Sequence, residues 1–391
     1  MREQVEIGRG RSAQRSYVFD DLDIVPSRRT RSASAVSTAW QLDAYRFELP
    51  LLTHPTDAVV SPATAARVGE LGGLGVLNAE GLWARHAEAE KALAEVVARA
   101  AIDPADAVAE LQRLHAAPVQ PALITEALER VRAAGATVAA RVSPQHARDL
   151  TPTLLAAGVE VLVVQGTIIS AEHVSGDGAE RSSTPGGGSG AGAEEGPLDL
   201  EAFIDGLDIP VVAGGVGDYR TAMHLMRTGA AGVIVGYGQA AATSTDAVLG
   251  IGVPMATALV DAAAARRDHL DETGGRYVHV VADGAMGTSG DIAKAIACGA
   301  DAVMLGEQLA AAEEAPGAGW YWTASAAHPS LPRSGITRVP TVAPDLATVL
   351  TGPARSGAGT MNLFGALRRA MAKTGYSDLK EFQRVGLSVR R

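Results

Sequence analysis

Eight short apolar runs, spread along the chain, constrain the fold of this sequence more than any other feature. The runs are rich in Val, Ile and Leu without regular polar alternation, which is typical of strands buried on both faces of a parallel sheet. We therefore expect strands at residues 50–55, 74–79, 137–142, 160–166, 209–215, 232–238, 278–284 and 301–306.

Amphipathic stretches separate most of these runs and predict helices. The stretches cover residues 125–134, 145–157, 218–228, 256–273 and 290–297. Four of them are closed by a glycine, which commonly follows a helix C-terminus, namely Gly135, Gly158, Gly229 and Gly299. The repetition of strand and helix with eight strands predicts one (β/α)8 TIM barrel over residues 1–391, with a doubly wound open sheet as the alternative.

Two segments lengthen the predicted connections between strands. Residues 80–124 extend the second connection with helical, acidic sequence. Residues 176–196 follow the fourth strand and are rich in Gly and Ser, so they cannot bury a core and are expected to be flexible. This second segment is either a tolerated surface insertion or a lid over a ligand.

Charge and cysteine usage narrow the classes of function. The 391 residues carry a net charge of −10, and no basic stripe interrupts it apart from Arg28, Arg29 and Arg31 and the terminal Arg390 and Arg391, so nucleic-acid binding is disfavoured. No apolar run approaches the ~20 residues needed to cross a membrane, and we find no secretory signal at the N-terminus. The single cysteine, Cys298, lies at the end of a predicted helix and is expected to be buried and structural. These features favour a cytoplasmic protein.

Small and hydroxyl residues follow the sixth predicted strand. Gly236 and Gly238 end it, and Thr243 and Thr245 come shortly after. In a (β/α)8 barrel the carboxyl ends of the strands bind ligands, and small residues there let the backbone approach a ligand closely. An ordinary surface loop has the same composition, so this pattern alone leaves both readings open.

The last two predicted strands end in a pattern that suits a phosphorylated ligand. Asp283 and Gly284 end the seventh strand, and Ser289 follows at a predicted helix N-terminus, which can bind phosphate through backbone amides. Ser289 is equally explained as the N-cap of that helix. The eighth strand ends at Gly306 and Glu307, and barrels often bind phosphate after strands seven and eight.

His54 and Asp57, after the first predicted strand, form a second group of polar residues. A lone histidine is more often structural than functional. No His, Cys, Asp or Glu cluster has the spacing of metal ligands, so no metal site is expected. The motifs of an α/β-hydrolase nucleophile and of a P-loop are also missing from the sequence.

Several phrases resemble the IMP dehydrogenase/GMP reductase family, in order and across nearly the whole chain. They include YVFDDLDIVP (17–26), AGGVGDYRTAMHLMRTGAAGVIVGYG (213–238), GIGVPMATAL (250–259) and ADGAMGTSGDIAKAIACGADAVMLG (282–306). The C-terminal phrases WYWTASAAHPSLPR (320–333) and NLFGALRRAMAKTGY (362–376) resemble a subgroup that lacks the family's CBS modules. The resemblance implies a TIM barrel that binds a purine mononucleotide (IMP, GMP or XMP), uses NAD or NADP, and assembles as a homotetramer or octamer.

The resemblance also implies roles for individual residues. Asp283 matches the family's ribose-binding aspartate, Gly284 and Gly306 its phosphate-loop glycines, and Gly236 and Gly238 the glycines before its catalytic loop. The nucleophilic cysteine of the family falls on Thr243, and Thr245 matches a threonine two positions later.

Other family positions hold different residues here. Gln165 and Gly215 stand at cofactor-contacting positions, in place of an aspartate and an asparagine. Ala241 and Glu307 stand where phosphate-contacting serines are usual, and Asp246 where an arginine is.

A threonine at the nucleophile position changes the expected chemistry. Family members add a cysteine thiolate to the purine C2, whereas a threonine hydroxyl is far less acidic and needs an adjacent base. Asp246 is the one candidate base that we find in this loop. The sequence therefore leaves open an oxidoreductase with altered chemistry, a non-catalytic nucleotide-binding or regulatory partner of an active paralogue, and a different enzyme that uses the same end of the barrel.

Overall fold

The structure is a computed structural model, and it describes residues 3–166, 169–173, 198–239, 242–243, 245–328, 335–339 and 345–390. The Gly/Ser-rich segment at 176–196 and Ala241 lie outside the described residues. Their predicted roles stay predictions.

Eight parallel strands form the centre of the molecule, and the two end strands of the sheet meet. The order is β6-β15-β14-β13-β12-β9-β8-β7. A parallel bridge between Leu52 and Leu74 joins β6 to the segment before β7, and the backbone N–H of Leu74 donates to the Leu51 carbonyl at 2.8 Å. The predicted (β/α)8 barrel is confirmed, and the open-sheet alternative is wrong. The strands are β6 (Leu51–Thr53), β7 (Val76–Asn78), β8 (Ala139–Val142), β9 (Val161–Gln165), β12 (Val211–Val216), β13 (Gly232–Gln239), β14 (His279–Gly284) and β15 (Ala302–Leu305).

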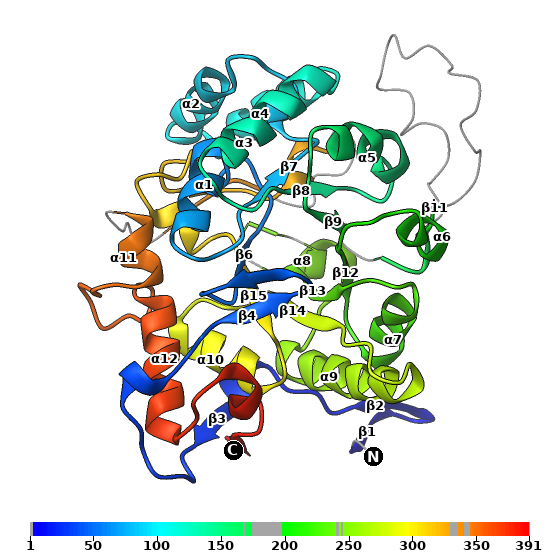
Figure 1. The fold of residues 1–391 in the computed structure, drawn as a ribbon, viewed down its shortest axis with the longest axis vertical. Coiled ribbons are helices and arrows are strands. Elements are labelled where there is room, and N and C mark those ends of the chain that lie inside the picture. Colours follow the sequence, from blue (N-terminus) through cyan, green and yellow to red (C-terminus); the bar gives the residue numbers. More distant parts are fainter. Residues whose placement is uncertain are drawn as a thin grey trace.

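Helices surround this barrel, as Figure 1 shows. Each turns an apolar face inward, for example α10 through its fully buried Ile292 and Ile296. Side-chain caps fix several starts: Asp218 accepts a hydrogen bond from the backbone N–H of Thr221 at the start of α7. The helices are α1 (Pro62–Glu70), α4 (Pro121–Ala133), α5 (Ala147–Ala156), α6 (Leu200–Asp205), α7 (Tyr219–Arg227), α9 (Met255–Glu272), α10 (Ser289–Ala297) and α12 (Leu363–Thr374).

The long second connection, predicted to be helical at 80–124, holds α2 (Ala89–Ala100) and α3 (Pro104–His115) before α4 begins. The start of α3 is set by Asp103, whose carboxylate accepts from the backbone N–H of Ala105, and by Pro104, whose ring favours the first helical position. The two helices lie beside α4 on one side of the barrel (Figure 1).

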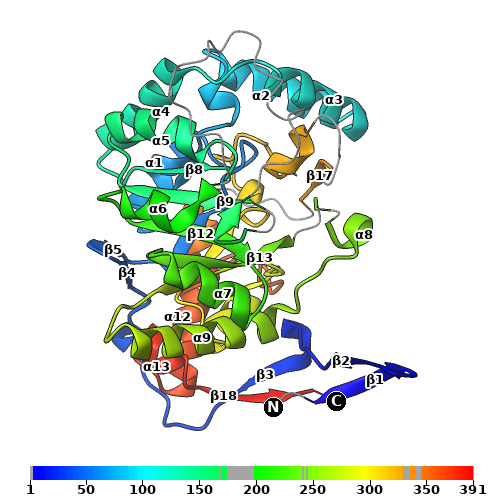
Figure 2. The same cartoon turned by 90° about the vertical axis from the view of Figure 1, so that its right-hand side faces the viewer.

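The two chain ends lie on the same side of the molecule, where β3 (Leu22–Val25) pairs antiparallel with β18 (Gly386–Val389) (Figure 2). The hairpin of β1 (Gln4–Gly8) and β2 (Arg11–Gln14) lies next to them. Among the described residues, no helix combines the length and the hydrophobicity needed to span a membrane. The remaining short elements are β4 (Trp40–Leu42), β5 (Tyr45–Phe47), β10 (Glu172–His173), β11 (Leu198–Asp199), β16 (Trp320–Tyr321), β17 (Thr337–Arg338), α8 (Thr245–Leu249), α11 (Leu346–Leu350) and α13 (Leu379–Phe382).

Candidate active site at the carboxyl ends of the strands

A cavity of about 400 Å³ opens at the carboxyl ends of β6, β14 and β15. This volume is typical of a small-molecule site, and this end of a (β/α)8 barrel is where such sites form. Residues from the N-terminal segment and from β16 complete its wall. The lining residues are Val18, Phe19, Asp20, His54, Gly238, Asp283, Gly284, Ala285, Met286, Gly287, Asp291, Met304, Leu305, Gly306, Glu307, Gln308 and Tyr321.

Asp283 is the buried acid of the cavity. It is the penultimate residue of strand β14, pairs in register with Met304 of β15, and is 3% exposed. The Gln165 side-chain amide donates to Asp283 Oδ2 at 2.8 Å. Burial raises the pKa of Asp283 to about 7, and the hydrogen bond from Gln165 offsets only part of that effect. A carboxyl group that ionises near neutral pH is therefore present at the ligand cavity.

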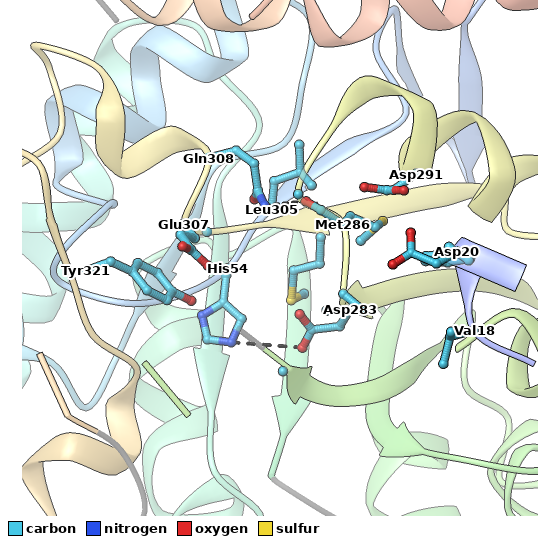
Figure 3. Close-up of a pocket in the computed structure, with 17 residues that line it drawn as sticks. Val18, Asp20, His54, Asp283, Met286, Asp291, Leu305, Glu307, Gln308 and Tyr321 are labelled. Atoms are coloured by element: carbon cyan, nitrogen blue, oxygen red, sulfur yellow. Dashed lines mark hydrogen bonds and ion pairs between the residues drawn. The ribbon is translucent and has the colours of Figure 1, made fainter. Parts of the chain in front are cut away.

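His54 faces this carboxyl group from the end of β6, as Figure 3 shows. Its Nε2 lies 3.9 Å from Asp283 Oδ2. Burial, together with the positive charge of Arg141, lowers the pKa of His54 to about 4, so the ring is neutral at pH 7. Within the described part of the chain, its Nδ1 is buried without a hydrogen-bond partner. The functional reading of His54, which the sequence does not favour, thus gains support from its position.

Three of the predicted glycines line the cavity. A Cβ on Gly306 would lie 2.6 Å from Tyr321 Oη, so glycine is needed where the aromatic ring crosses the strand end. Gly238 has φ +65°, and Gly284 has φ +108°, in the region that favours glycine. The structure therefore brings Gly238, Gly284 and Gly306 together with Asp283 at one cavity, and their nucleotide-binding roles stay predictions.

Gly236, the fourth predicted glycine, does not line the cavity but packs closely against the backbone of Asp283. Its φ is +116°, and a Cβ there would lie 2.0 Å from the backbone carbonyl oxygen of Asp283. We expect Gly236→Ala to lower the free energy of unfolding by at least about 2 kcal/mol more than Gly274→Ala, measured by denaturant unfolding. Gly274 is a matched control because it also has positive φ but open space at its Cβ position. Equal losses in the two variants would contradict this packing role.

Thr243 and Thr245, the predicted catalytic pair, lie on the loop after β13 and at the start of α8. The two hydroxyl oxygens are 3.1 Å apart, and Thr243 is partly buried. Neither residue belongs to the lining of the described cavity. Figure 2 shows α8 beside the barrel, displaced from the ring of strands. In the described residues, the hydrogen-bond partners of Thr243 Oγ1 are the hydroxyl and the backbone N–H of Thr245, neither of which is a base.

Gln165 and Gly215, the predicted cofactor contacts, form hydrogen bonds with other residues of the barrel. The Gln165 amide is engaged with Asp283, as described above. The Gly215 N–H donates to the Gly166 carbonyl at 3.1 Å, and its own carbonyl accepts from the Ile169 N–H at 3.1 Å. Their assignment to a cofactor therefore stays a prediction.

Carboxylates from three elements surround the outer part of the cavity: Asp20, Asp291 and Glu307. Thr288 Oγ1 accepts from the backbone N–H of Asp291, so Thr288, not Ser289, is the N-cap of α10. In return, Asp291 Oδ2 accepts from the backbone N–H and the hydroxyl of Thr288. The expected phosphate site at this helix N-terminus is thus already partly occupied by a carboxylate of the helix itself.

Sequence reasoning did not single out Asp20, Asp291 and Tyr321 as lining residues. Asp20 is part of the YVFDDLDIVP phrase, which is the one signal that marked its neighbourhood. Burial and the negative charges of Asp283 and Glu307 raise the pKa of Tyr321 well above its usual value. Its hydroxyl therefore stays protonated and is a hydrogen-bond donor at the cavity wall.

Cys298 is buried at the C-cap of α10, ahead of β15 and thus at the opposite end of that strand from the cavity. Burial raises the pKa of its thiol to about 12. Within the described residues, no group of three or more His, Cys, Asp or Glu side chains could hold a metal ion. The titratable side chains that line the cavity carry carboxyl, imidazole and phenol groups.

Comparison with known proteins places this site in a family. Residues 200–328 match the IMP dehydrogenase / GMP reductase domain. An uncharacterized oxidoreductase of Mycolicibacterium smegmatis is 61% identical over 98% of this chain and 99% of its own length. A segment of 110 residues is 47% identical to the inosine-5′-monophosphate dehydrogenase of Haemophilus influenzae, covering 28% of this chain and 21% of that protein.

A solved structure extends the similarity to the whole fold. The IMP dehydrogenase/GMP reductase-like protein of Corynebacterium glutamicum is 51% identical, with a TM-score of 0.90, and the match covers 99% of this chain and 98% of that one. Sequence and fold thus agree over nearly the full length, and the chain belongs to the IMP dehydrogenase/GMP reductase family of oxidoreductases.

Proposed function

We propose that the cavity binds a purine ribonucleoside 5′-monophosphate (IMP, GMP or XMP) and that the protein is an oxidoreductase acting on it without a cysteine nucleophile. One observation carries this proposal: Asp283, a buried acid, faces the cavity between Gly238, Gly284 and Gly306 at the carboxyl ends of the strands. Carboxylates bind sugar hydroxyls well, and glycines let backbone groups approach a ligand.

Covalent catalysis by a thiol has no support in this chain. The sequence contains one cysteine, and Cys298 is buried away from the cavity with a pKa raised to about 12. A thiolate is the reactive form, so this thiol is unreactive at neutral pH. Thr243, at the position that the resemblance gives to the nucleophile, has no adjacent base among its described partners. Any turnover must therefore use another route to the hydride transfer.

A second candidate is a nucleotide-binding protein that does not turn its ligand over, acting alone or with an active paralogue. The position of Thr243 outside the cavity lining favours this candidate. Both candidates bind a nucleotide at Asp283, so they differ only in chemistry.

Replacement of Thr243 distinguishes the two candidates. We would assay the parent, Thr243→Cys and the hydroxyl-retaining control Thr243→Ser with IMP plus NAD or NADP, and with GMP plus the reduced cofactors, following reduced-nicotinamide absorbance. If the protein is an oxidoreductase without a thiol step, the parent and Thr243→Ser turn over at similar rates. If only the nucleophile was lost, Thr243→Cys alone gains activity. If the protein shows no turnover and calorimetry detects no binding of any purine nucleotide, both candidates are contradicted.

The family resemblance extends this proposal to the hydride carrier and the assembly. NAD or NADP is the expected carrier, and the assay above includes both. A homotetramer or octamer in the cytoplasm is the expected state, without nucleic acid or membrane as a partner. Light scattering that shows a monomer would contradict the expected assembly.

A further inference from the structure

We propose that protonation of His115 strengthens a contact between α3 and the barrel, so that the long second connection supports one wall of the ligand cavity in a pH-dependent way. His115 is the last residue of α3, and its partner Asp57 belongs to the loop between β6 and α1. The wall segment, residues 320–328, carries Tyr321, which lines the cavity. Neither His115 nor Asp57 lines the cavity, so the contact does not depend on which ligand binds there.

Helix α3 contacts the wall segment directly. It packs on α2 and on a short 3-10 helix of the wall segment at Ala324–Ala327. Figure 2 shows the orange segment that precedes β17 next to α3. The Gln112 side-chain amide also donates to the His328 carbonyl at 2.9 Å. A shift of α3 relative to the barrel would therefore move the segment that carries Tyr321.

Asp57 connects the same helix to the barrel. Its carboxylate Oδ2 lies 3.5 Å from His115 Nε2, and the two side chains are 3% and 14% exposed. The neighbouring Thr56 donates from Oγ1 to the Trp322 carbonyl at 2.5 Å. The loop after β6 thus contacts α3 on one side and the wall segment on the other.

The buried carboxyl group of Asp57 has few hydrogen bonds of its own. Oδ2 accepts from the backbone N–H of Leu82 at 3.0 Å. Oδ1 is buried and has no hydrogen-bond partner in the described part of the chain. A Cβ on Gly81 would lie 2.2 Å from Oδ1, so the backbone closes over this oxygen. A buried carboxylate needs donors or a cation, and the His115 ring is placed to supply both.

The hydrogen bond on the other side of the ring makes this contact depend on a proton. His115 Nδ1 lies 2.9 Å from the Leu111 carbonyl oxygen, which can only accept, so Nδ1 carries the hydrogen. In the neutral ring, Nε2 then presents a lone pair to the Asp57 carboxylate, which does not attract it. The protonated ring donates from both nitrogens and brings a positive charge to Asp57.

The other charged groups around the pair have partners of their own. Arg85 donates from Nη1 to the His115 carbonyl at 2.9 Å and from Nε to the Glu80 carbonyl at 2.8 Å. His86 Nε2 lies 2.9 Å from the Leu114 carbonyl oxygen. The remaining charged side chains of α3 form ion pairs within the extension, namely Asp106, Glu110 and Arg113. Among the described residues, the basic side chain that forms an ion pair with Asp57 is His115.

The contact is therefore expected to be strong in mild acid and weak in mild base. The stabilisation that a protonated histidine provides is lost as the pH rises through the range in which imidazole titrates, about pH 5 to 8. A hydrogen bond to a charged group is strong enough to make local opening about 10-fold rarer. A wall that stays in place also loses less freedom when a ligand binds, so affinity should be higher in mild acid.

Hydrogen–deuterium exchange of the full chain without ligand, measured on peptides that cover α3 and the wall segment, tests the proposal. Each rate is compared with the intrinsic exchange rate at the same pH. His115→Gln keeps a polar side chain that cannot take up a proton. This variant should lower the protection of the wall segment by about 10-fold at pH 6 and leave it unchanged at pH 8.

Two further variants complete the comparison. Asp57→Asn removes the other charge and should cause the same loss at pH 6. The double variant of His115 and Asp57 should lose no more than either single variant, because the two side chains act as one pair. His224→Gln, the same exchange at an exposed histidine of α7, is the control and should behave as the parent.

Equal protection of the wall segment in the parent and in His115→Gln at pH 6 overturns the proposal. A loss of the same size at pH 6 and pH 8 also overturns it, because packing of the ring, and not its proton, would then hold the segment. Asp57→Asn provides the same test if His115→Gln does not fold.

Calorimetry with IMP extends the test to binding. His115→Gln should bind IMP more weakly than the parent at pH 6 and equally well at pH 8, and an unchanged affinity at pH 6 overturns the role of the contact in binding. If no purine nucleotide binds, the proposed function is contradicted, and the exchange measured without ligand still decides whether the contact supports the wall.

Discussion

Exchange of Asp283 for asparagine is expected to stabilise the protein above pH 8 and to weaken nucleotide binding at the same time. The carboxyl group is 3% exposed, and burial raises its pKa to about 7. Ionising Asp283 in the folded protein therefore costs more free energy than ionising it in the unfolded chain. Asparagine has nearly the same shape, and its side-chain oxygen can accept the hydrogen bond from Gln165 Nε2.

The pH dependence follows from the direction of this shift. Between the unfolded pKa of 3.8 and the folded pKa of about 7, the folded protein binds more protons than the unfolded chain does. The contribution of Asp283 to the free energy of unfolding is therefore largest below pH 4 and is lost as the pH rises through about 7. At pH 8 the Asp283→Asn variant should exceed the parent by about 2–4 kcal/mol, and below pH 4 the difference should disappear.

The same exchange removes the negative charge to which a ribose hydroxyl would donate a hydrogen bond. Hydrogen bonds to a charged group contribute about 1.5–3 kcal/mol, so IMP should bind the variant about 10- to 100-fold more weakly. Thermal unfolding from pH 4 to pH 9 and calorimetry with IMP measure the two effects. Asp20→Asn is the control, because Asp20 lines the same cavity but is exposed, and its stability should change little. A variant that is less stable than the parent at pH 8 would contradict the burial argument.

The barrel could be predicted because its strands are buried on both faces. A strand such as β9 has five buried residues in succession, which produces an uninterrupted apolar run in the sequence. Each of the eight predicted runs overlaps a strand of the barrel, although their ends differ, as in the run 74–79, where β7 covers Val76–Asn78. Strand ends are set by hydrogen bonds to neighbouring strands, and these bonds leave no pattern along one chain.

Helix starts were harder to predict than helix ends. The positive φ of Gly158 and Gly229, +73° and +90°, explains why a glycine marks the C-terminal ends of α5 and α7. The amphipathic pattern predicts that α4 starts at residue 125, whereas the helix begins four residues earlier, at Pro121. Proline is favoured at the first position of a helix but breaks a helix at interior positions. The apolar pattern alone therefore does not show that the helix begins at this proline.

The sequence predicts only those residues of the candidate site whose positions are set by the ends of the barrel strands. Asp283 lies at the end of β14 and Gly306 directly follows β15, so the topology alone places both at the cavity. Thr243 comes several residues after β13, and the course of that loop depends on contacts that the sequence does not reveal. Tyr321 reaches the cavity from β16, which is not a strand of the barrel, and packs there against Gly306.

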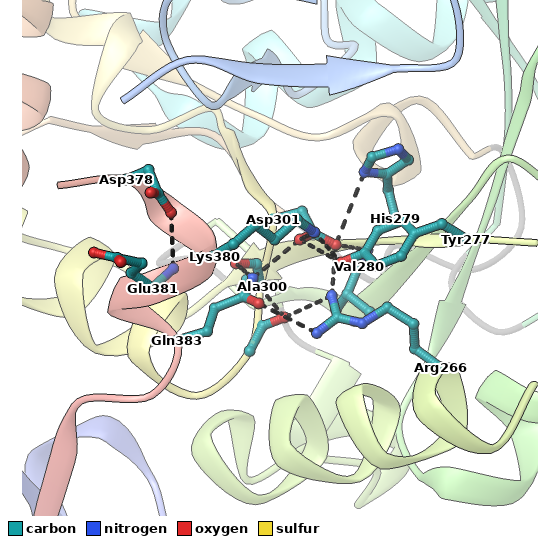
Figure 4. Close-up of polar contacts among 11 residues, drawn as sticks. Arg266, Tyr277, His279, Val280, Ala300, Asp301, Asp378, Lys380, Glu381 and Gln383 are labelled. Carbon is teal, nitrogen blue, oxygen red and sulfur yellow. Dashed lines mark hydrogen bonds and ion pairs between the residues drawn. The ribbon is translucent and has the colours of Figure 1, made fainter. Parts of the chain in front are cut away.

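Exchange of Asp301 for asparagine is expected to destabilise the protein strongly without involving the cavity. Asp301 precedes β15, at the end of the strand opposite to the ligand cavity, and it lies at the centre of the buried polar network in Figure 4. Arg266 Nη1 and Lys380 Nζ each lie 2.6 Å from one of its two carboxylate oxygens. The Val280 N–H and the Gln383 amide also donate to it, at 2.9 and 3.0 Å.

This network connects the barrel to the C-terminal segment, because Lys380 and Gln383 belong to the region of α13. Removal of the negative charge leaves the Arg266 guanidinium, which is 8% exposed, without its counter-ion. Breaking a buried ion pair on one side typically costs 3–5 kcal/mol, so we expect a loss of about that size in the free energy of unfolding at pH 7. Asp23→Asn is the control, since Asp23 pairs with Arg390 on the surface, where ion pairs contribute little.

The effect of Asp301→Asn should also depend on pH, in the direction opposite to that of Asp283→Asn. Burial alone would raise the pKa of Asp301, but the charges of Arg266 and Lys380 hold it well below its usual value of 3.8. Its stabilising contribution is therefore complete above pH 4 and is lost as the pH falls toward the lowered folded pKa. Acid unfolding of the two proteins should converge as Asp301 becomes protonated, since protonation removes the same charge as the substitution. A loss of stability that stays constant down to the most acidic conditions would show that packing, and not the ion pair, connects the C-terminal segment to the barrel.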